Sequence, residues 1–115
     1  MKRIEAIIAA EKVLSVNDAL KRAGVGGATI LDAKGRGKGE KPKVATHRGT
    51  DRVPAEFSAR ASVITVVEDS EVDKVIKAIL DTVSTGSPGD GKIFVSTVSD
   101  AVDIGSKKRG GVALD

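Results

Sequence analysis

The sequence predicts one α+β domain built from two strand–helix–strand units, and three observations lead to this fold class. The chain has 115 residues, which is room for one hydrophobic core. Hydrophobic residues make up 40% and charged residues 30%, a balance typical of folded globular proteins. Two apolar, β-branched segments are each followed by a helical pattern that stops at a glycine. We therefore expect residues 1–115 to form a single domain.

The first unit lies at the start of the chain. Its opening segment, Arg3–Ala9, is a short isoleucine-rich run typical of a buried strand. Ser15 followed three residues later by Asp18 predicts a helix start with Ser15 as its N-cap. Gly24 would end this helix, and Gly26–Leu31 resumes an extended pattern. The apolar face of the helix is predicted to consist of Val16, Ala19, Leu20 and Ala23.

The second unit repeats this plan. The β-branched segment Arg60–Val67 predicts a strand, and Ser70 with Asp73 three residues later predicts a second capped helix. Gly86 would end the helix, and Lys92–Thr97 predicts the last strand. The predicted helical stripe consists of Val72, Val75, Ile76, Ile79, Leu80 and Val83.

Two such units in tandem predict a ferredoxin-like double βαβ sandwich, with four strands in one antiparallel sheet and two helices on one of its faces. Both helices cover the same face, so the opposite face is left for another molecule to bury. We therefore expect a homo-oligomer.

A long basic segment separates the two units. Residues 34–52 carry seven cations and two acids, a local charge of +5 in a chain whose net charge is +3. The whole connection, residues 34–58, exceeds the roughly 12–15 residues beyond which a loop in a compact domain is usually functional or disordered. It predicts an anionic partner at this place, although a solvated loop would have a similar composition. The tail, residues 103–115, is polar and contains several glycines.

Composition excludes several classes of function. The chain has no cysteine and only one histidine, His47, so thiol chemistry and a histidine-rich metal centre are not expected, and we predict no metal site. No apolar run approaches the roughly 20 residues of a membrane span, and Glu5 comes too early for a secretory signal, so we expect a cytoplasmic protein. No acid pair or nucleophile–base pair is recognisable, so we do not expect an enzyme.

Two glycine-rich basic corners point to phosphate. Residues 86–92 have the spacing of a P-loop up to Lys92, but Ile93 stands where a P-loop has serine or threonine. The motif would also follow a helix and precede a strand, whereas the P-loop of a nucleoside triphosphatase follows a strand and precedes a helix. What survives is an anion-binding nest of backbone N–H groups beside an ammonium group; the alternative is a simple turn that ends the helix. Residues 34–39 alternate cations with glycines, which suits either a polyanion or a flexible loop.

Four segments together resemble the PII signal-transduction proteins. They are Met1–Ile8, Lys34-Gly35-x-Gly37, Arg48-Gly49 and Thr85-Gly86-x-x-Gly89-Asp90-Gly91-Lys92-Ile93-Phe94-Val95. The resemblance implies a homotrimer that holds ATP or ADP in the clefts between its subunits and is not an enzyme. It also implies that the long loop reaches a target protein such as an ammonium transporter or a nitrogen-assimilation enzyme, with no nucleic acid involved and with membranes met only through a transporter.

The resemblance also implies site residues. Those expected at the phosphates are Gly35, Arg36, Gly37 and Lys38 from the first corner and Gly89, Asp90, Gly91 and Lys92 from the second. Those expected to line the adenine and ribose are Ile7, Thr29 and Ile64. Those expected on the loop that meets the target are Lys43, His47, Arg48, Thr50 and Arg52.

The sequence departs from the family pattern in three places. The usual arginine-x-arginine pair is replaced by Asp103-Ile104-Gly105, and the nearby Lys107, Lys108 and Arg109 are the candidates to substitute. A usual glutamine corresponds to Gly39 and a usual lysine to Arg60, the two positions expected at an effector anion, which counts against 2-oxoglutarate with Mg²⁺. Arg52 stands where some members carry a modified tyrosine, and Thr50 is either an acceptor or a solvated turn residue.

Two other functions stay open. A divergent sensor would bind ADP or AMP with another small anion such as bicarbonate, which fits the lost arginine pair. An RNA-binding domain of the same fold would use the basic segment, but such modules stack bases on sheet aromatics and only Phe94 is present on the predicted strands.

Overall fold

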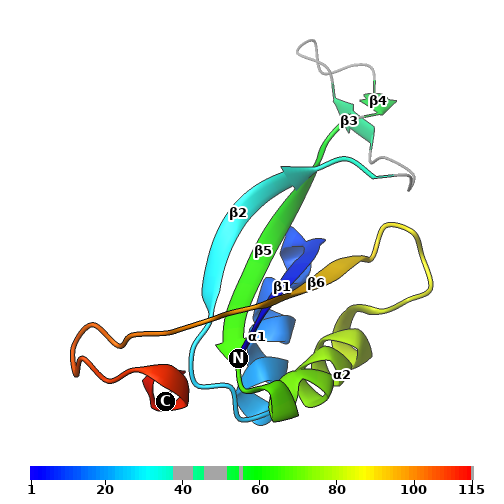
Figure 1. The fold of residues 1–115 in the computed structure, drawn as a ribbon. Coiled ribbons are helices and arrows are strands. Elements are labelled where there is room, and N and C mark those ends of the chain that lie inside the picture. The colour runs from blue at the N-terminus through cyan, green and yellow to red at the C-terminus, as the bar shows by residue number, and fades with distance from the viewer. Residues whose placement is uncertain (38–42, 46–51, 55, 115) are drawn as a thin grey trace.

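The computed structural model describes residues 1–37, 43–45, 52–54 and 56–114, with the backbone alone for 43–45 and 52–54. The strands and helices in chain order are β1 (Lys2–Ala9), α1 (Val13–Arg22), β2 (Thr29–Gly35), β3 (Lys43–Ala45), β4 (Arg52–Pro54), β5 (Ser58–Val67), α2 (Val72–Val83) and β6 (Gly91–Thr97) (Figure 1). Short 3₁₀ segments span Ala10–Lys12, Asp69–Glu71 and Gly110–Leu114.

The main sheet has the order β2-β5-β1-β6 with antiparallel neighbours throughout. The helices α1 and α2 lie against one face of this sheet (Figure 1). Two strand–helix–strand units therefore interlock with both first strands inside and both last strands outside. This arrangement confirms the α+β, ferredoxin-like fold that the sequence predicts.

The core lies between the helices and the sheet. Along β1, Ile4, Ala6 and Ile8 are buried and alternate with half-buried residues, the period of two expected for a strand with one covered face. The buried apolar side chains that meet them are Val16 and Leu20 from α1, Ala61, Val63 and Val67 from β5, and Val75, Ile79 and Val83 from α2. Each fully buried Ile or Leu contributes roughly 1.5–3 kcal/mol relative to exposure, so this cluster fixes which way each element faces.

The opposite face of the sheet is built in rows set by the strand register. One row is Leu31, Ser62, Ile7 and Lys92, and the next is Thr29, Ile64, Glu5 and Phe94. Leu31 and Phe94 are 51% and 53% exposed. This open face holds large apolar side chains in contact with solvent, which supports the expectation that another copy of the chain covers it. The homotrimer itself stays a prediction.

Both helices begin differently from the sequence prediction. A 3₁₀ turn leads into α1, which starts at Val13, so Ser15 lies inside the helix and is not its N-cap. A second 3₁₀ turn contains Ser70, and α2 starts at Val72 without a side-chain cap. In both cases the chain enters the helix through the 3₁₀ turn, so a serine three residues before an acid is not a sufficient signal for the helix start.

The strands next to the long connection extend further than expected. Strand β2 begins at Thr29, later than the predicted Gly26, and continues to Gly35, while β5 begins two residues before Arg60. The pairing of Gly35 with Ser58 extends the ladder. Part of the segment predicted as loop 34–58 is thus strand, and β3 and β4 pair as a small hairpin beyond the end of the sheet (Figure 1).

One predicted core position is wrong. Leu80 belongs to the helical stripe of α2 but is 48% exposed. It lies just past the line of Val75, Ile79 and Val83, which the sheet covers. Neither helix of the described residues, at 10 and 12 residues, has the length and apolar character of a membrane span.

Candidate functional site

The α2–β6 turn (residues 84–90) is held closed by its own last residue. The carboxylate of Asp90 accepts hydrogen bonds from the Thr85 N–H at 2.5 Å, the Thr85 hydroxyl at 2.6 Å and the Gly86 N–H at 3.0 Å. The hydroxyl of Thr85 and these N–H groups stabilise the ionised form and hold the pKa of the Asp90 carboxyl below its usual value. The Asp90 carboxylate therefore bonds within the turn. The family resemblance, by contrast, places this residue at the phosphates.

The start of β6 requires glycine. Gly91 has a φ of +120°, and a Cβ at this position would stand 2.0 Å from the carbonyl oxygen of Ile7. The next residue, Lys92, is paired in register with Ile7 on the open face of the sheet. Among the described residues, no carboxylate forms an ion pair with Lys92. Its ammonium group is available to a ligand beside β1.

Arg60 joins the two glycine-rich corners. From β5 its Nη1 donates to the carbonyl oxygen of Gly89 at 2.8 Å, and its Nε donates to Ser58 Oγ at 3.1 Å. Ser58 Oγ in turn donates to the carbonyl oxygen of Gly35 at 3.4 Å. A Cβ on Gly35 would stand 3.1 Å from Arg60 Cγ, so the end of β2 fits closely against this side chain. Sequence analysis predicts two corners, and the structure brings them together across the end of β1.

A hollow of about 650 Å³ lies beside this junction. It is bounded by the 3₁₀ segment Ala10–Lys12, the start of β5 and the α2–β6 turn. Its charged lining residues are Lys12 and Arg60 together with the acids Glu11 and Asp90. Many of the backbone N–H groups of the turn are already used inside it, since Gly89 donates to Ser87 Oγ at 3.2 Å. The groups that a ligand would meet here are thus side chains more than backbone. Lys12 and Arg60 would attract anionic oxygens, while Glu11 and Asp90 carry charge of the opposite sign.

Other predicted site residues lie away from this junction. Thr29 and Ile64 face each other on the open face, one row beyond Ile7. Thr29 is on one edge strand and Lys92 on the other, so three strand spacings of about 4.8 Å each separate their strands. Ile64 lies on β5, two strand spacings from β6 and one row away from Lys92. Neither Thr29 nor Ile64 is therefore a neighbour of Lys92 within one subunit.

The three candidate substitute cations belong to a second turn, the C-terminal turn (residues 100–109). Arg109 donates its Nε to Asp100 Oδ2 at 3.2 Å and forms an ion pair with the same carboxylate. This contact lowers the pKa of Asp100 and raises that of Arg109. Lys107 adopts a φ of +64° in the turn, and Lys108 is exposed. The turn lies at the opposite end of β6 from Lys92 (Figure 1).

Several predicted residues fall in or near the long connection. Arg36 is exposed and forms an ion pair with Glu56 at 3.3 Å, and Gly37 follows it in the described chain. Lys43 is the first residue of β3, and Arg52 is the first residue of β4. Outside the described residues lie Lys38, Gly39, His47, Arg48 and Thr50.

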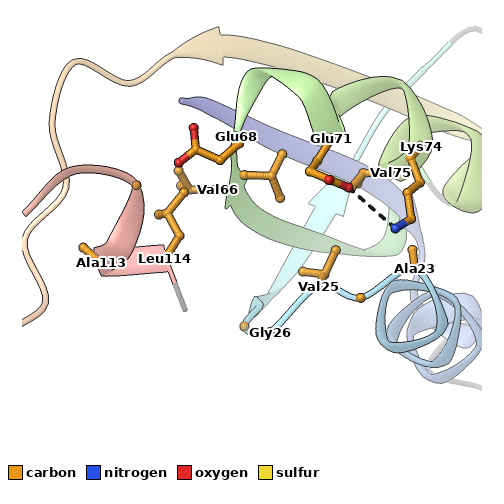
Figure 2. Close-up of a pocket in the computed structure, with 14 residues that line it drawn as sticks. Ala23, Val25, Gly26, Val66, Glu68, Glu71, Lys74, Val75, Ala113 and Leu114 are labelled. Atoms are coloured by element: carbon orange, nitrogen blue, oxygen red, sulfur yellow. Dashed lines mark ion pairs between the residues drawn. The ribbon is translucent and has the colours of Figure 1, made fainter.

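A further hollow of about 510 Å³ lies at the end of the molecule where α2 starts. Figure 2 shows Val25 and Val75 lining it, Leu114 of the C-terminal 3₁₀ segment beside it, and the ion pair of Glu71 with Lys74 at 3.6 Å. None of the residues predicted from the sequence as site residues lines this hollow. The chemistry is concentrated instead at the Arg60 junction.

Sequence reasoning missed the hydroxyl residues of the site. Thr85, Ser87 and Ser58 each form a hydrogen bond that shapes one of the two corners. For Thr85 and Ser87 the signal was present, because serine and threonine within a glycine-rich turn commonly bond to nearby backbone or carboxylate groups. For Ser58 no local signal exists, since its partners come from β2 and from Arg60.

Comparison with known proteins decides the family. The family model described as nitrogen regulatory protein P-II matches residues 1–108. Nitrogen regulatory protein P-II of Azospirillum brasilense is 40% identical over 114 residues, covering 99% of this chain and 100% of the relative. The chain belongs to the PII family. The Rhodospirillum rubrum relative is also 40% identical over 114 residues, and that of Rhizobium meliloti 39% over 110 residues, or 96% of each chain.

Membership confirms the resemblance that the glycine-rich motifs predict. The relatives are named as regulatory proteins and not as enzymes, and this chain is accordingly a regulator of the PII type. The PII match includes both corners and the C-terminal turn as far as Lys108.

Proposed function

We propose that this PII protein binds an adenine nucleotide, ATP or ADP, with its phosphates at the junction of the two glycine-rich corners. The observation that carries the proposal is the hydrogen-bonded link from Gly35 through Ser58 and Arg60 to Gly89, which joins the two corners. Lys92 of the second corner forms no ion pair within the described part of the chain. Lys92 would form a charge-assisted hydrogen bond to a phosphate oxygen. Arg60 would add positive charge, because its guanidinium has five N–H donors and only part of them are used.

The nucleotide would lie between subunits. Thr29 and Ile64 do not approach Lys92 within one chain, and neither does the C-terminal turn with Lys107 and Lys108. A neighbouring copy packed against the open face would supply both groups to one cleft. The exposed Phe94 and Leu31 provide the apolar area for such packing in a homotrimer.

The long connection would carry the signal to a target protein. In chain order, β3 and β4 lie between β2 and β5, the two strands that end at the first glycine-rich corner and at Arg60. A ligand that contacts the root of this connection in one arrangement only would shift the population toward that arrangement. Its charge of +5 over residues 34–52 suits a target surface with acidic groups, on a protein such as an ammonium transporter or a nitrogen-assimilation enzyme.

In this proposal the protein does not bind 2-oxoglutarate with Mg²⁺ as a second ligand beside the nucleotide. Of the two positions expected at an effector anion, Gly39 has no side chain to contribute, and Arg60 stands where the family usually has lysine. A smaller anion such as bicarbonate, bound with ADP or AMP, is the alternative that Gly39 and the lost arginine pair favour.

Calorimetric titration of ADP and ATP tests the main proposal. Lys92→Ala should weaken binding by about tenfold or more, because it removes a charge-assisted hydrogen bond without touching the core. The matched control is Lys77→Ala, which removes an exposed lysine of α2 that pairs with Asp81, and its affinity should equal that of the wild type. Native mass spectrometry should show a trimer for all three proteins. A wild-type protein that binds no adenylate contradicts the proposal.

A thermal-shift panel separates the two ligand sets. It compares ATP, ADP, AMP, 2-oxoglutarate and bicarbonate, alone and in pairs, since a ligand that binds only the folded state raises its apparent stability. Extra stabilisation by bicarbonate together with ADP or AMP would support the alternative. Mutual enhancement between ATP and 2-oxoglutarate in the presence of Mg²⁺ would exclude it.

A further inference from the structure

The α2–β6 turn contains a hydrogen-bond network that the nucleotide proposal does not use. Thr85 Oγ1 donates to Asp90 Oδ1 at 2.6 Å and accepts from the Ser87 N–H at 3.4 Å. The backbone N–H groups of Thr85 and Gly86 both donate to Asp90 Oδ2. The Asp90 N–H closes the turn by donating to the Ser87 carbonyl at 3.1 Å. One carboxylate and one hydroxyl thus fix both ends of the turn to each other.

The residues on either side of Asp90 attach this network to the sheet. Arg60 bonds to the carbonyl of Gly89, one residue before Asp90. Gly91, one residue after Asp90, lies so close to the backbone of Ile7 that no side chain fits there. Asp90 therefore stands between two points where the turn meets β1 and β5, and the backbone direction into Lys92 depends on its geometry.

We propose that Thr85 and Asp90 are positioning residues for the second glycine-rich corner, residues 86–92. Their paired side chains fix the α2–β6 turn before the ligand binds. Lys92 and the Gly89 carbonyl that accepts from Arg60 are thereby already in their binding positions. The inference rests on the proposed nucleotide function. A turn already fixed in its binding conformation loses less conformational entropy on binding, so the pair raises affinity without contacting the ligand. Thr85 is exposed and Asp90 is half-buried, and neither belongs to the core cluster, so the pair contributes little to the hydrophobic packing.

Two substitutions of Thr85 test this role by calorimetry with ADP. Thr85→Val keeps the shape of the side chain but removes the hydroxyl, and it should weaken ADP binding by about three- to tenfold. Thr85→Ser retains a hydroxyl and should restore most of the wild-type affinity, a rescue that shape alone cannot produce. Asp81→Asn, an exposed carboxylate of α2 paired with Lys77, is the control and should bind like the wild type.

A second variant and a second measurement make the outcome decisive. Asp90→Asn keeps the size of the side chain but replaces one acceptor oxygen with an NH₂ group, so amide hydrogen exchange at Thr85 and Gly86 should accelerate in the ligand-free protein. Equal ADP affinity in wild type, Thr85→Val and Asp90→Asn would overturn the positioning role alone. Absence of adenylate binding by the wild type would overturn the proposed function and the positioning role with it. Unchanged exchange in Asp90→Asn would also overturn the positioning role.

Discussion

The α2–β6 turn and the C-terminal turn lie at opposite ends of β6, and both combine glycine, a hydroxyl residue and an aspartate. Lys92 follows the first turn inside β6, whereas Lys107 and Lys108 lie within the second. The two turns differ in whether their hydrogen bonds reach the sheet or stay within the turn. The α2–β6 turn is fastened to the sheet by Arg60 and by the contact of Gly91 with Ile7. The C-terminal turn is fastened largely to itself, with Asp103 accepting from the Ser106 N–H and hydroxyl at 2.9 and 2.7 Å.

The difference separates structural cations from those free to bind a ligand. In the C-terminal turn Arg109 closes the structure through its ion pair with Asp100, and an isolated bridge joins it to Val102. In the α2–β6 turn neutral donors close the structure, and Lys92 takes no part. A cation that holds its own turn must break that contact before it can bind phosphate. Within the proposed nucleotide site, Lys107 and Lys108 are therefore better candidates than Arg109 to replace the arginine pair.

The largest effect is expected at the point where the α2–β6 turn meets β1. Gly91→Ala should lower the free energy of unfolding by about 2–4 kcal/mol, because the new Cβ would collide with the Ile7 carbonyl at a φ that alanine rarely adopts. Urea denaturation measures the change. Gly89→Ala in the same turn is the control, since its Cβ would stand 3.7 Å from Ser87 Oγ, and it should change stability by less than about 0.5 kcal/mol. Equal losses in both variants would contradict the assignment of Gly91 as the anchoring point.

The second effect concerns the link between the corners. Arg60→Gln should remove the hydrogen bonds to Gly89 and Ser58 and lower the free energy of unfolding by about 1–2 kcal/mol. Amide resonances of both Gly35 and Gly89 should shift together in an NMR spectrum, because the same side chain contacts both corners. A shift confined to one of them would show that Arg60 does not couple the corners.

A third comparison addresses the cations of the C-terminal turn. The double variant Lys107→Ala, Lys108→Ala should weaken ATP binding by about fivefold, the order expected for losing exposed charge contacts to phosphate. Arg109→Ala should change ATP affinity by less than about twofold while shifting the amide resonances around Asp100, its ion-pair partner. The reverse ranking would identify Arg109 as the phosphate contact.

The smallest effect is a change in the titration of Asp90. Its pKa is lowered from 3.8, chiefly by the Thr85 hydroxyl, so the stabilising effect of the ionised form is complete above that value and is lost as the pH falls through the lower folded value. Thr85→Val should move this pKa upward toward 3.8 in an NMR titration. Asp103, whose pKa is lowered by Ser106 at the other end of β6, is the internal control and should not move.

Residues that act with near neighbours in the chain could be predicted from the sequence. The glycines at 24 and 86 occupy left-handed turns, and the apolar spacing of Val75, Ile79 and Val83 places them in the core. Helix starts were less predictable, because Ser15 and Ser70 carry a capping pattern while the chain enters each helix through a 3₁₀ turn. Two glycine-rich corners were also readable, since their composition is local.

The sequence by itself determined the order of the two helices and the four strands of the main sheet, most of the buried face of each helix and the turns at Gly24 and Gly86. These properties depend on hydrophobic periodicity and backbone preference over a few residues. Only the tertiary structure decided that Arg60 reaches Gly89, that Asp90 bonds within its turn, and that Thr29 lies strands away from Lys92. Strand register and side-chain hydrogen bonds set those distances between residues far apart in the chain, and no local pattern encodes them.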